Sequence, residues 1–364
     1  MNMVPSIGPV RYKNLKDHFG NIADVFSAEL DELISVDGIS ETTAKAIMSA
    51  GGRRTLAEKE IDSANANGIE ILELEDVHYP SLLKMIPDPP PILYCKGDKS
   101  VLNRASVALV GSRKSTPYGE KVAEKLSREL AEYDVVTVSG LARGIDTAVH
   151  RAAVQAKGKT VAVLGSGLLR VYPPENKKLA EEIAFRGAVL SEFPLNTPPD
   201  AGNFPRRNRI IAGMSLGTVV VEADERSGSL ITAKLAAEQG KDIFAVPGPI
   251  FSKTSRGTHM LIKQGAKLVE SCRDIMEEIN NLKGLAEASV AGGKIRDEKG
   301  SGAFIPVLSP EEEIIFDFVD FEPVHIDVLS SKSALGSGEF SRVLLNLELK
   351  GAVKALPGKM YVRN

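Results

Sequence analysis

The chain has 364 residues, of which 43% are hydrophobic and 26% charged, and its formal net charge is −3. This length fits two or three globular domains of ordinary composition. The small net charge excludes a uniformly basic protein, so nucleic-acid binding would need a local patch of cations. Two scattered cysteines form no disulfide framework, and five scattered histidines lack the spacing of a zinc site, so we expect no metal. Because no apolar run is long enough to span a membrane and no signal peptide is evident, we expect a cytoplasmic protein without membrane contact.

Residues 1–70 are predicted to form a small helical domain. The segment from Leu33 to Ile47 has the pattern helix, tight turn, helix, and it resembles a helix-hairpin-helix (SAM-like) module. In that motif a Gly-hydrophobic-Gly turn offers backbone N–H groups to a DNA phosphate, but here Ser40 stands in place of the second glycine. Ser40 is suited to cap the second helix. We therefore favour a packing or partner-binding module over a DNA clamp.

Residues 71–280 are predicted to form a Rossmann-like α/β domain with a doubly wound, mostly parallel sheet. Residues 75–105 are rich in proline, which fixes φ and blocks helix formation, so we expect an extended connector there. After it, short apolar runs alternate with helical segments, which is typical of parallel sheets. The predicted strands are 106–110, 135–139, 160–164, 188–191, 218–221 and 242–246.

Residues 281–305 carry few apolar anchors and predict a flexible linker. Residues 306–364 are predicted to form a winged-helix domain, with helices over 310–319 and 338–350 and a hairpin around Pro357-Gly358. The second of these helices carries Glu339 and Glu348 beside Arg342 and Lys350. Because acidic residues repel phosphate, we favour a protein-contact role for this domain, with duplex DNA binding as the alternative.

The stretch from Val107 to Gly119 places a buried strand directly before a glycine, two cations and several hydroxyl groups. Gly111, like Gly140 after a later strand, would let a ligand approach the backbone closely. Ligands of open α/β sheets bind at the carboxyl ends of the strands, where helix N-termini favour anions. The cations expected to converge there are Arg113, Lys114, Arg143, Arg206, Arg207, Arg209 and Arg226. Together with a ring that stacks bases, Phe204, they suit single-stranded nucleic acid better than duplex.

The same residues also have a structural interpretation. We expect about half of the seven cations to be structural, for example Arg209 paired with a carboxylate such as Glu192. Asp146 fits a helix N-cap as well as an active acid, and His150 fits a hydrogen-bonded core histidine. The sequence shows no arrangement of nucleophile, base and acid, and neither a P-loop nor a dinucleotide fingerprint is complete. We therefore predict no catalytic residue and no nucleotide cofactor.

Several different short motifs occur within residues 105–270. They are Gly111-Ser112-Arg113, the run 139–150, the run 204–213, Glu222-Ala223 with 227–233, and Val246-Pro247-Gly248. In combination they resemble the DNA-processing protein A family (DprA/Smf), whose layout of helical, Rossmann-like and winged-helix domains also matches. The resemblance implies a homodimeric, non-enzymatic protein that binds and protects incoming single-stranded DNA. It also implies loading of the RecA recombinase onto that DNA during natural transformation and homologous recombination.

The resemblance points to Arg113 and to Phe204 with its arginine cluster as DNA-contacting positions. The predicted DNA-binding residues are Gly111, Ser112, Arg113, Lys114, Gly140, Arg143, Phe204, Arg206, Arg207, Asn208, Arg209, Ser227, Gly228 and Ser229. The residues proposed for the dimer interface, which fit the core equally well, are Met260, Leu261 and Ile262. The chain departs from the family pattern in two places: no lysine stands at Ala201 or Gly202, and His259 replaces a common asparagine.

An alternative of a different class is a nucleotide-binding enzyme of the phosphoribohydrolase type, which also uses glycine-rich strand ends. Such enzymes carry a Pro-Gly-Gly-x-Gly-Thr loop, and the nearest match here, Pro247-Gly248-Pro249, lacks it. Release of a base from a nucleoside monophosphate, lost on substitution of Asp146 or Glu222, would support this alternative.

Overall fold

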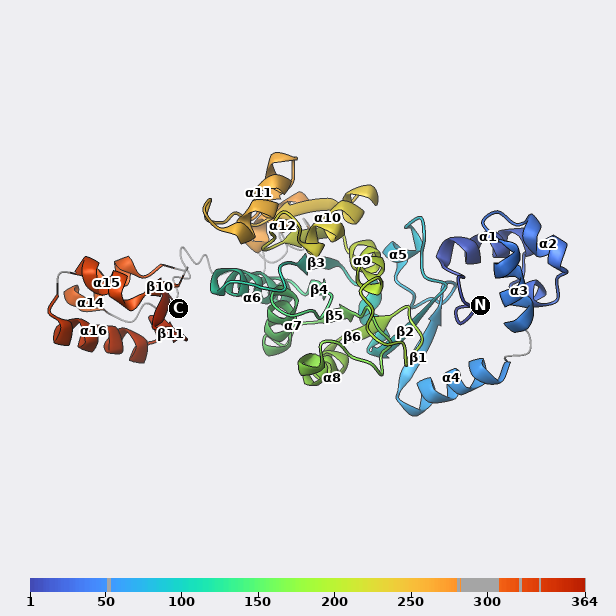
Figure 1. The fold of residues 1–364 in the computed structure, drawn as a ribbon, viewed down its shortest axis with the longest axis horizontal. Coiled ribbons are helices and arrows are strands. Elements are labelled where there is room, and N and C mark those ends of the chain that lie inside the picture. Colours follow the sequence, from blue (N-terminus) through green and yellow to red (C-terminus); the bar gives the residue numbers. More distant parts are fainter. Residues whose placement is uncertain (51–53, 280–281, 283–307, 321–322, 334, 364) are drawn as a thin grey trace. The chain divides into compact units, whose positions relative to one another are not determined.

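The computed structural model describes residues 1–50, 54–279, 282, 308–320, 323–333 and 335–363 (Figure 1). The chain divides into two compact units, a large one of Met1–Lys114 and Ala123–Ala286 and a small one of Ser115–Val122 and Glu287–Asn364. Apart from Leu282, the flexible linker predicted over 281–305 lies outside the described residues. Within the described residues, no helix combines the length and the apolar character needed to cross a membrane.

The N-terminal part is helical, as the sequence predicts. Its helices are α1 (Pro9–Phe19), α2 (Leu30–Ser35), α3 (Glu41–Ala50) and α4 (Arg54–Ala66), with a 3-10 turn η1 (Asp24–Phe26). Buried side chains from these elements, Leu15, Val25, Leu33 and Ile47 among them, form a core of their own. The backbone N–H of Thr43 donates to the Ser40 hydroxyl at 3.3 Å, so Ser40 caps α3 as expected.

Nine strands of the described residues form one sheet in the order β1-β2-β6-β5-β4-β3-β7-β8-β9. The parallel strands are β3 (Ser106–Val110), β4 (Val136–Ser139), β5 (Thr160–Val163), β6 (Ala188–Ser191), β7 (Gly217–Val220), β8 (Asp242–Ala245) and β9 (Lys267–Leu268). The chain runs outward from β3 through β6 on one side and then returns to place β7 on the other side of β3. This reversal creates a crevice at the carboxyl ends of β3 and β7, the place where such sheets bind ligands.

The proline-rich segment corrects one prediction, because it belongs to the sheet rather than connecting to it. Strands β1 (Ile69–Glu73) and β2 (Ile92–Gly97) pair antiparallel with each other, and β2 pairs antiparallel with β6. Between them Tyr79 is fully buried and its hydroxyl donates to the carbonyl of Pro90 at 2.7 Å. The prolines lie in the turns on either side of α5 (Ser81–Lys84), which leaves the backbone of β2 free to pair.

Helices connect the strands of the parallel sheet. They are α6 (Pro117–Glu132), α7 (Ile145–Gln155), α8 (Lys177–Arg186), α9 (Asn203–Gly213), α10 (Gly228–Glu238), α11 (Arg256–Lys263) and α12 (Cys272–Glu278), with short 3-10 turns η3 (Lys99–Asn103), η4 (Pro174–Asn176) and η5 (Lys253–Ser255). Helices α7 and α8 pack on the strands β3 to β6, while α9 and α10 pack against each other and α10 covers β7 and β8 (Figure 1). The N-terminal ends of α7, α9 and α10 therefore follow strand ends at the crevice, which sets up the site described below.

The C-terminal unit has the winged-helix arrangement that the sequence predicts. Its elements are α14 (Pro310–Phe318), β10 (Val324–His325), α15 (Ile326–Ser333), α16 (Ser337–Leu349), β11 (Val353–Leu356) and β12 (Met360–Arg363). Its strands form a small sheet in the order β10-β12-β11, and its core contains Ile315, Leu329 and Leu344.

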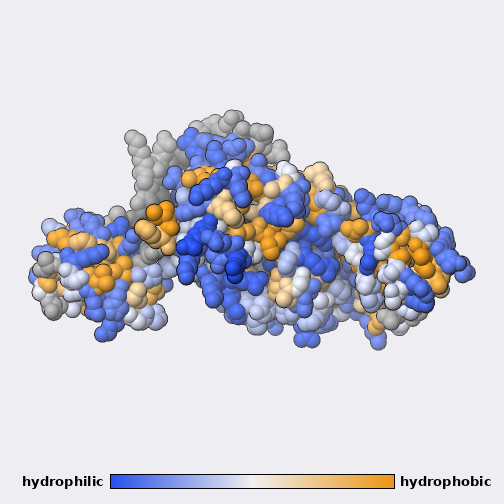
Figure 2. Space-filling view, turned by 45° about the horizontal axis from the view of Figure 1, so that its top comes forward, coloured by the Kyte–Doolittle hydropathy of each residue, from blue (hydrophilic) through white to orange (hydrophobic). Residues whose placement is uncertain are grey.

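On the face of the protein shown in Figure 2, hydrophilic side chains predominate and hydrophobic ones lie between them in small groups, as is normal for a folded surface.

Candidate functional site

A hollow of about 740 Å³ opens at the carboxyl ends of β3 and β7. Its wall is built by the loop after β3, the start of α9, and the loop after β7 with the first turns of α10. Ten of the predicted DNA-binding residues line it: Gly111, Ser112, Arg113, Lys114, Phe204, Arg207, Asn208, Ser227, Gly228 and Ser229. The structure therefore brings together residues that lie more than a hundred positions apart in the sequence, at the point that the strand order dictates.

Three exposed cations and two aromatic rings stand at the mouth of this hollow, and we call them the rim: Arg113, Lys114, Arg226, Tyr172 and Phe204. The guanidinium of Arg113 lies over the Phe204 ring at 4.9 Å from its centroid, and the Tyr172 ring lies 5.8 Å from that of Phe204. Among the described residues, no carboxylate forms an ion pair with the three cations. Their charge is therefore available to an anionic ligand.

Below the rim lie three buried polar side chains, Asp146, His150 and Arg207, which we call the floor; of these, Asp146 and Arg207 line the hollow. One nitrogen of the Arg207 guanidinium donates to the carbonyls of Gly140, at 2.7 Å, and Val163. Burial lowers the pKa of Arg207 to about 10, so it stays charged at neutral pH. The positive charge of the floor is therefore engaged in hydrogen bonds to backbone carbonyls.

Asp146 is neither a helix N-cap nor an exposed acid. Gly144 precedes α7 as its N-cap, and the Asp146 carboxylate accepts hydrogen bonds from the backbone N–H groups of Gly140, at 3.2 Å, and Ala142, at 3.3 Å. Burial raises the pKa of Asp146, and the charge of Arg207 opposes that rise. The side chain therefore shapes the loop between β4 and α7.

His150 is a fully buried core histidine, as the structural interpretation predicts. Because the hydroxyl of Thr160 donates to the carbonyl of Thr137 at 2.9 Å, it accepts from Nδ1–H of His150 at 2.8 Å. Burial, followed by the nearby charge of Arg207, lowers the pKa of His150 to about 3. The imidazole is therefore neutral in the folded protein.

At the two glycines expected to admit a ligand, the space that a side chain would occupy is taken by other residues of the protein. A Cβ atom at Gly140 would lie 2.5 Å from the Arg207 guanidinium, and one at Gly111 would lie 2.6 Å from the side chain of Ile145. Both glycines are therefore required for close packing inside the protein, and Gly111 also lines the large hollow, so close approach of a ligand to its backbone stays a prediction. Gly140 lies outside the wall of the large hollow and borders a smaller one.

Three of the arginines predicted to converge do not face the large hollow. Arg209 is buried and pairs with Asp88 at 3.1 Å and Glu192 at 2.5 Å, which confirms the structural interpretation for this residue. Arg206 lies over the ring of Phe193 instead, 5.4 Å from its centroid. Arg206 and Arg209 are three residues apart and lie on the same side of α9, whereas Arg207 is turned by about 100° from Arg206, so only Arg207 of the three lines the large hollow.

Arg143 is the third of these arginines. It is exposed, but its guanidinium pairs with the Glu175 carboxylate at 2.5 Å. The hydrogen bond with Glu175 is the main cause that raises the pKa of Arg143. The sequence places these two residues 32 positions apart, so the pair could not be foreseen from spacing.

The first turn of α10 forms the wall opposite α9. Ser227 caps this helix, because its hydroxyl accepts from the backbone N–H of Ser229 at 3.4 Å. The side-chain amide of Asn208 donates to the carbonyl of Gly228 at 3.4 Å and joins α9 to α10. Helix N-termini favour anions, so this wall complements the cations of the rim.

Sequence reasoning missed Tyr172 as a residue of this site. It lies between β5 and α8, in the run Val171-Tyr172-Pro173-Pro174, and borders the hollow beside Phe204. An aromatic residue in the loop after a strand end was the available signal, but the loop is too long to place the ring by spacing alone. Among the described residues, no group of three or more His, Cys, Asp or Glu side chains is placed to hold a metal ion.

Residues 70–280, which build the sheet and the hollow, match the family described as DNA recombination-mediator protein A. The chain belongs to this family. Residues 303–359 match the DprA winged helix domain, and residues 1–50 match the SAM-like helix-hairpin-helix tandem.

Individual members of the DNA recombination-mediator protein A family are similar over most of their length. Protein Smf from Synechocystis sp. is 34% identical over 387 residues, which span 100% of this chain and 97% of that protein. The X-ray structure of DNA processing protein A from Streptococcus pneumoniae is 38% identical with a TM-score of 0.69, covering 77% of this chain and 96% of that one. A structure of DNA processing protein A from Helicobacter pylori, whose description reports a single-stranded DNA binding mode, is 33% identical with a TM-score of 0.53. The match covers 60% of this chain and 96% of that one.

Proposed function

We propose that this protein binds single-stranded DNA in the hollow at the carboxyl ends of β3 and β7. The observation that carries the proposal is the rim, where Arg113, Lys114 and Arg226 are exposed without an ion-pair partner among the described residues, beside the rings of Tyr172 and Phe204. Cations neutralise phosphates and rings stack bases, and bases of a single strand are free to stack. Family membership supports the proposal, since the Helicobacter pylori relative is described by its single-stranded DNA binding mode.

The hollow favours a single strand for a geometric reason as well. Its aromatic rings lie beside the cations at the mouth, whereas a duplex keeps its bases stacked inside and presents only phosphates and groove edges. No catalytic step is part of the proposal, because the buried acid of the hollow, Asp146, is engaged with the backbone of Gly140 and Ala142. We infer that the protein acts by binding.

We further propose that the bound strand is protected and passed to the RecA recombinase, in natural transformation and homologous recombination. What supports this step is membership of a family described as recombination mediators. The test is the rate at which RecA assembles on single-stranded DNA, followed by its DNA-dependent ATP hydrolysis, with and without this protein. A rate that the protein leaves unchanged would contradict the loading step and leave DNA binding intact.

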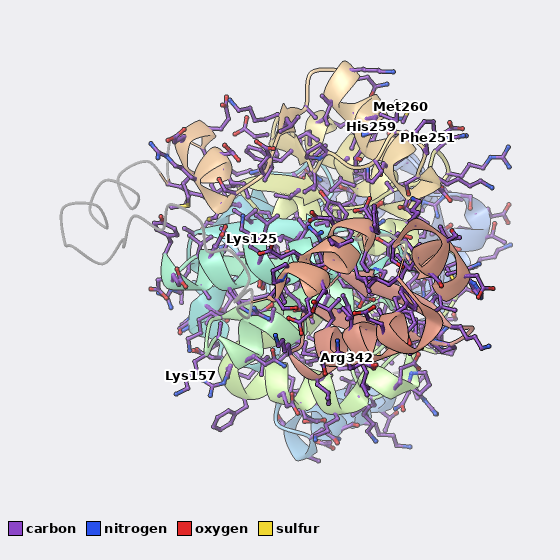
Figure 3. The ribbon with its side chains drawn as sticks, turned by 90° about the vertical axis from the view of Figure 1, so that its left-hand side faces the viewer. Lys125, Lys157, Phe251, His259, Met260 and Arg342 are labelled. Atoms are coloured by element: carbon purple, nitrogen blue, oxygen red, sulfur yellow. The ribbon has the colours of Figure 1, made fainter. Side chains whose placement is uncertain are left out.

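A homodimer is the proposed assembly, through the surface of α11 and β9. Figure 3 labels His259 and Met260 of α11 in the same part of the view as Phe251, which precedes this helix and whose side chain is 90% exposed. Leu261 packs partly against the central core and Ile262 is half-buried, so Met260 is the more exposed of the predicted contact residues. At the end of the sheet, β9 also presents the exposed Leu268. Light scattering would show a dimer for the unaltered protein and a monomer for Leu268→Arg.

The decisive experiment for DNA binding is fluorescence anisotropy of a labelled oligo-dT and of a matched duplex across a salt series. We expect tighter binding of the single strand, and an affinity that falls log-linearly with salt because phosphates are neutralised. Arg113→Ala should weaken binding about tenfold with the fold intact, as judged by its melting temperature. Unaltered affinity in this variant would remove the site assignment, and no binding of either DNA would redirect the search to nucleoside monophosphates.

A further inference from the structure

The ring of Phe204 offers less free surface than its sequence motif suggests. The Arg113 guanidinium lies 4.9 Å from its centroid, and the backbone of Gly165 packs so closely that an added Cβ there would lie 2.7 Å from the Phe204 ring. A base that stacks on Phe204 must therefore share the ring with Arg113. A hollow built to hold more than one base needs another aromatic surface.

Tyr172 provides that surface. Its ring is half-exposed, lies 5.8 Å from the Phe204 ring, and is inclined to it by 46°, so the two rings adjoin without stacking face to face. Tyr172 and Phe204 both border the large hollow and a smaller neighbouring hollow of about 30 Å³, which places them on the ridge between the two. The pair thus offers adjacent aromatic surfaces at the mouth of the site.

The backbone around Tyr172 is held in place by the loop that follows β4. The side-chain amide of Asn176, four residues further on, donates to the carbonyl of Leu141 at 2.9 Å and to the hydroxyl of Thr147 at 2.8 Å. Pro173, next to the tyrosine, is buried. A ring on a fixed segment loses little conformational freedom when a ligand stacks on it, which favours binding.

We propose that Tyr172 is a second base-stacking residue, which receives a base next to the one held at Phe204. This inference rests on the proposed function, because it assigns a further contact to the same single strand. Successive bases of single strands commonly stack on successive aromatic side chains in this way, with little dependence on sequence. The hydroxyl group is not required for stacking, so phenylalanine should replace tyrosine at this position.

The experiment compares Tyr172→Ala, Tyr172→Phe and the unaltered protein on two oligonucleotides of equal length, oligo-dT and an abasic strand with the same phosphates. A matched control is Phe185→Ala, since Phe185 is an aromatic residue of α8 that is 85% exposed and lies outside both hollows. We expect Tyr172→Ala to weaken oligo-dT binding about tenfold and to leave abasic binding unchanged. Tyr172→Phe and Phe185→Ala should bind both strands like the unaltered protein.

The abasic strand separates stacking from a structural role. If Tyr172→Ala weakens binding of both strands equally, the ring only supports the site and the inference is overturned. If it changes neither while Phe204→Ala weakens oligo-dT binding, the inference fails and the proposed function stands. If the unaltered protein binds no strand, the proposed function fails with it.

A measurement on the unaltered protein guards against a variant that does not fold. Irradiation of the complex with an oligonucleotide that carries 5-iodouracil cross-links bases to the aromatic rings on which they stack. We expect peptides that contain Tyr172 among the cross-linked products. Cross-links at Phe204 without any at Tyr172 would overturn the inference.

Discussion

The rim and the floor of the central hollow use the same residue type for opposite purposes. Arg113, at the rim, is exposed and contacts a ring, so its charge can meet a phosphate. Arg207, at the floor, is 3% exposed and donates to the carbonyls of Gly140 and Val163, so its charge holds the loops together. The number of arginines in a motif therefore does not measure its capacity to bind anions, because burial commits some of them to the fold.

The first and largest prediction concerns the floor. Arg207→Ala removes the hydrogen bonds donated to two backbone carbonyls and the positive charge near buried Asp146, so it should lower the free energy of unfolding by about 3–5 kcal/mol. Urea unfolding followed by circular dichroism measures this loss. Arg113→Ala, the matched variant at the rim, should stay within about 0.5 kcal/mol of the unaltered protein. Equal losses of unfolding free energy in the two variants would contradict the distinction between rim and floor.

The second prediction concerns the pH dependence of the unfolding free energy that arises from His150 in the floor. The pKa of His150 is about 3 in the folded protein, against an ordinary value of 6.5, so between these pH values the unfolded chain binds a proton at His150 and the folded protein does not. The contribution of His150 to stability is therefore complete above pH 6.5 and is lost as the pH falls towards 3, by up to about 1.4 kcal/mol for each pH unit. The difference in unfolding free energy between the unaltered protein and His150→Gln should shrink accordingly. A difference that stays constant with pH would show that the imidazole is not held neutral.

The third and smallest expected effect is on DNA affinity, and its test compares a residue of the rim with a residue of the C-terminal unit. Lys114→Ala should weaken single-stranded DNA binding severalfold, about 1 kcal/mol, and reduce the dependence on salt by about one phosphate. Arg342→Ala on α16, where Glu339 pairs with Arg342 at 4.0 Å, should leave the affinity within twofold of the unaltered protein, about 0.4 kcal/mol. Anisotropy titrations at three salt concentrations distinguish the two variants. A larger loss in Arg342→Ala than in Lys114→Ala would make the winged helix the principal DNA-binding surface.

The predicted strands of the parallel sheet agree with β3 to β8 within one residue at each end, because each is a short apolar run between helices. The pairing of β1 and β2 could not be predicted, since the prolines between them hide two strands that join the sheet edge. The loops at the strand ends were correctly expected to meet at one edge, because parallel strands share their direction.

The parallel sheet, the helical N-terminal part and the C-terminal winged helix could be predicted from the sequence, and so could the edge of the sheet at which we propose that a ligand binds. Those features follow from local patterns of apolar, glycine and charged residues, which act over a few positions. Which cations are available to a ligand could not be predicted in the same way, because ion pairs such as Arg143 with Glu175 and Arg209 with Asp88 join residues that are far apart in the chain and meet through folding. Folding also places Tyr172 beside Phe204, since the distance between two rings depends on how loops pack rather than on their spacing in sequence.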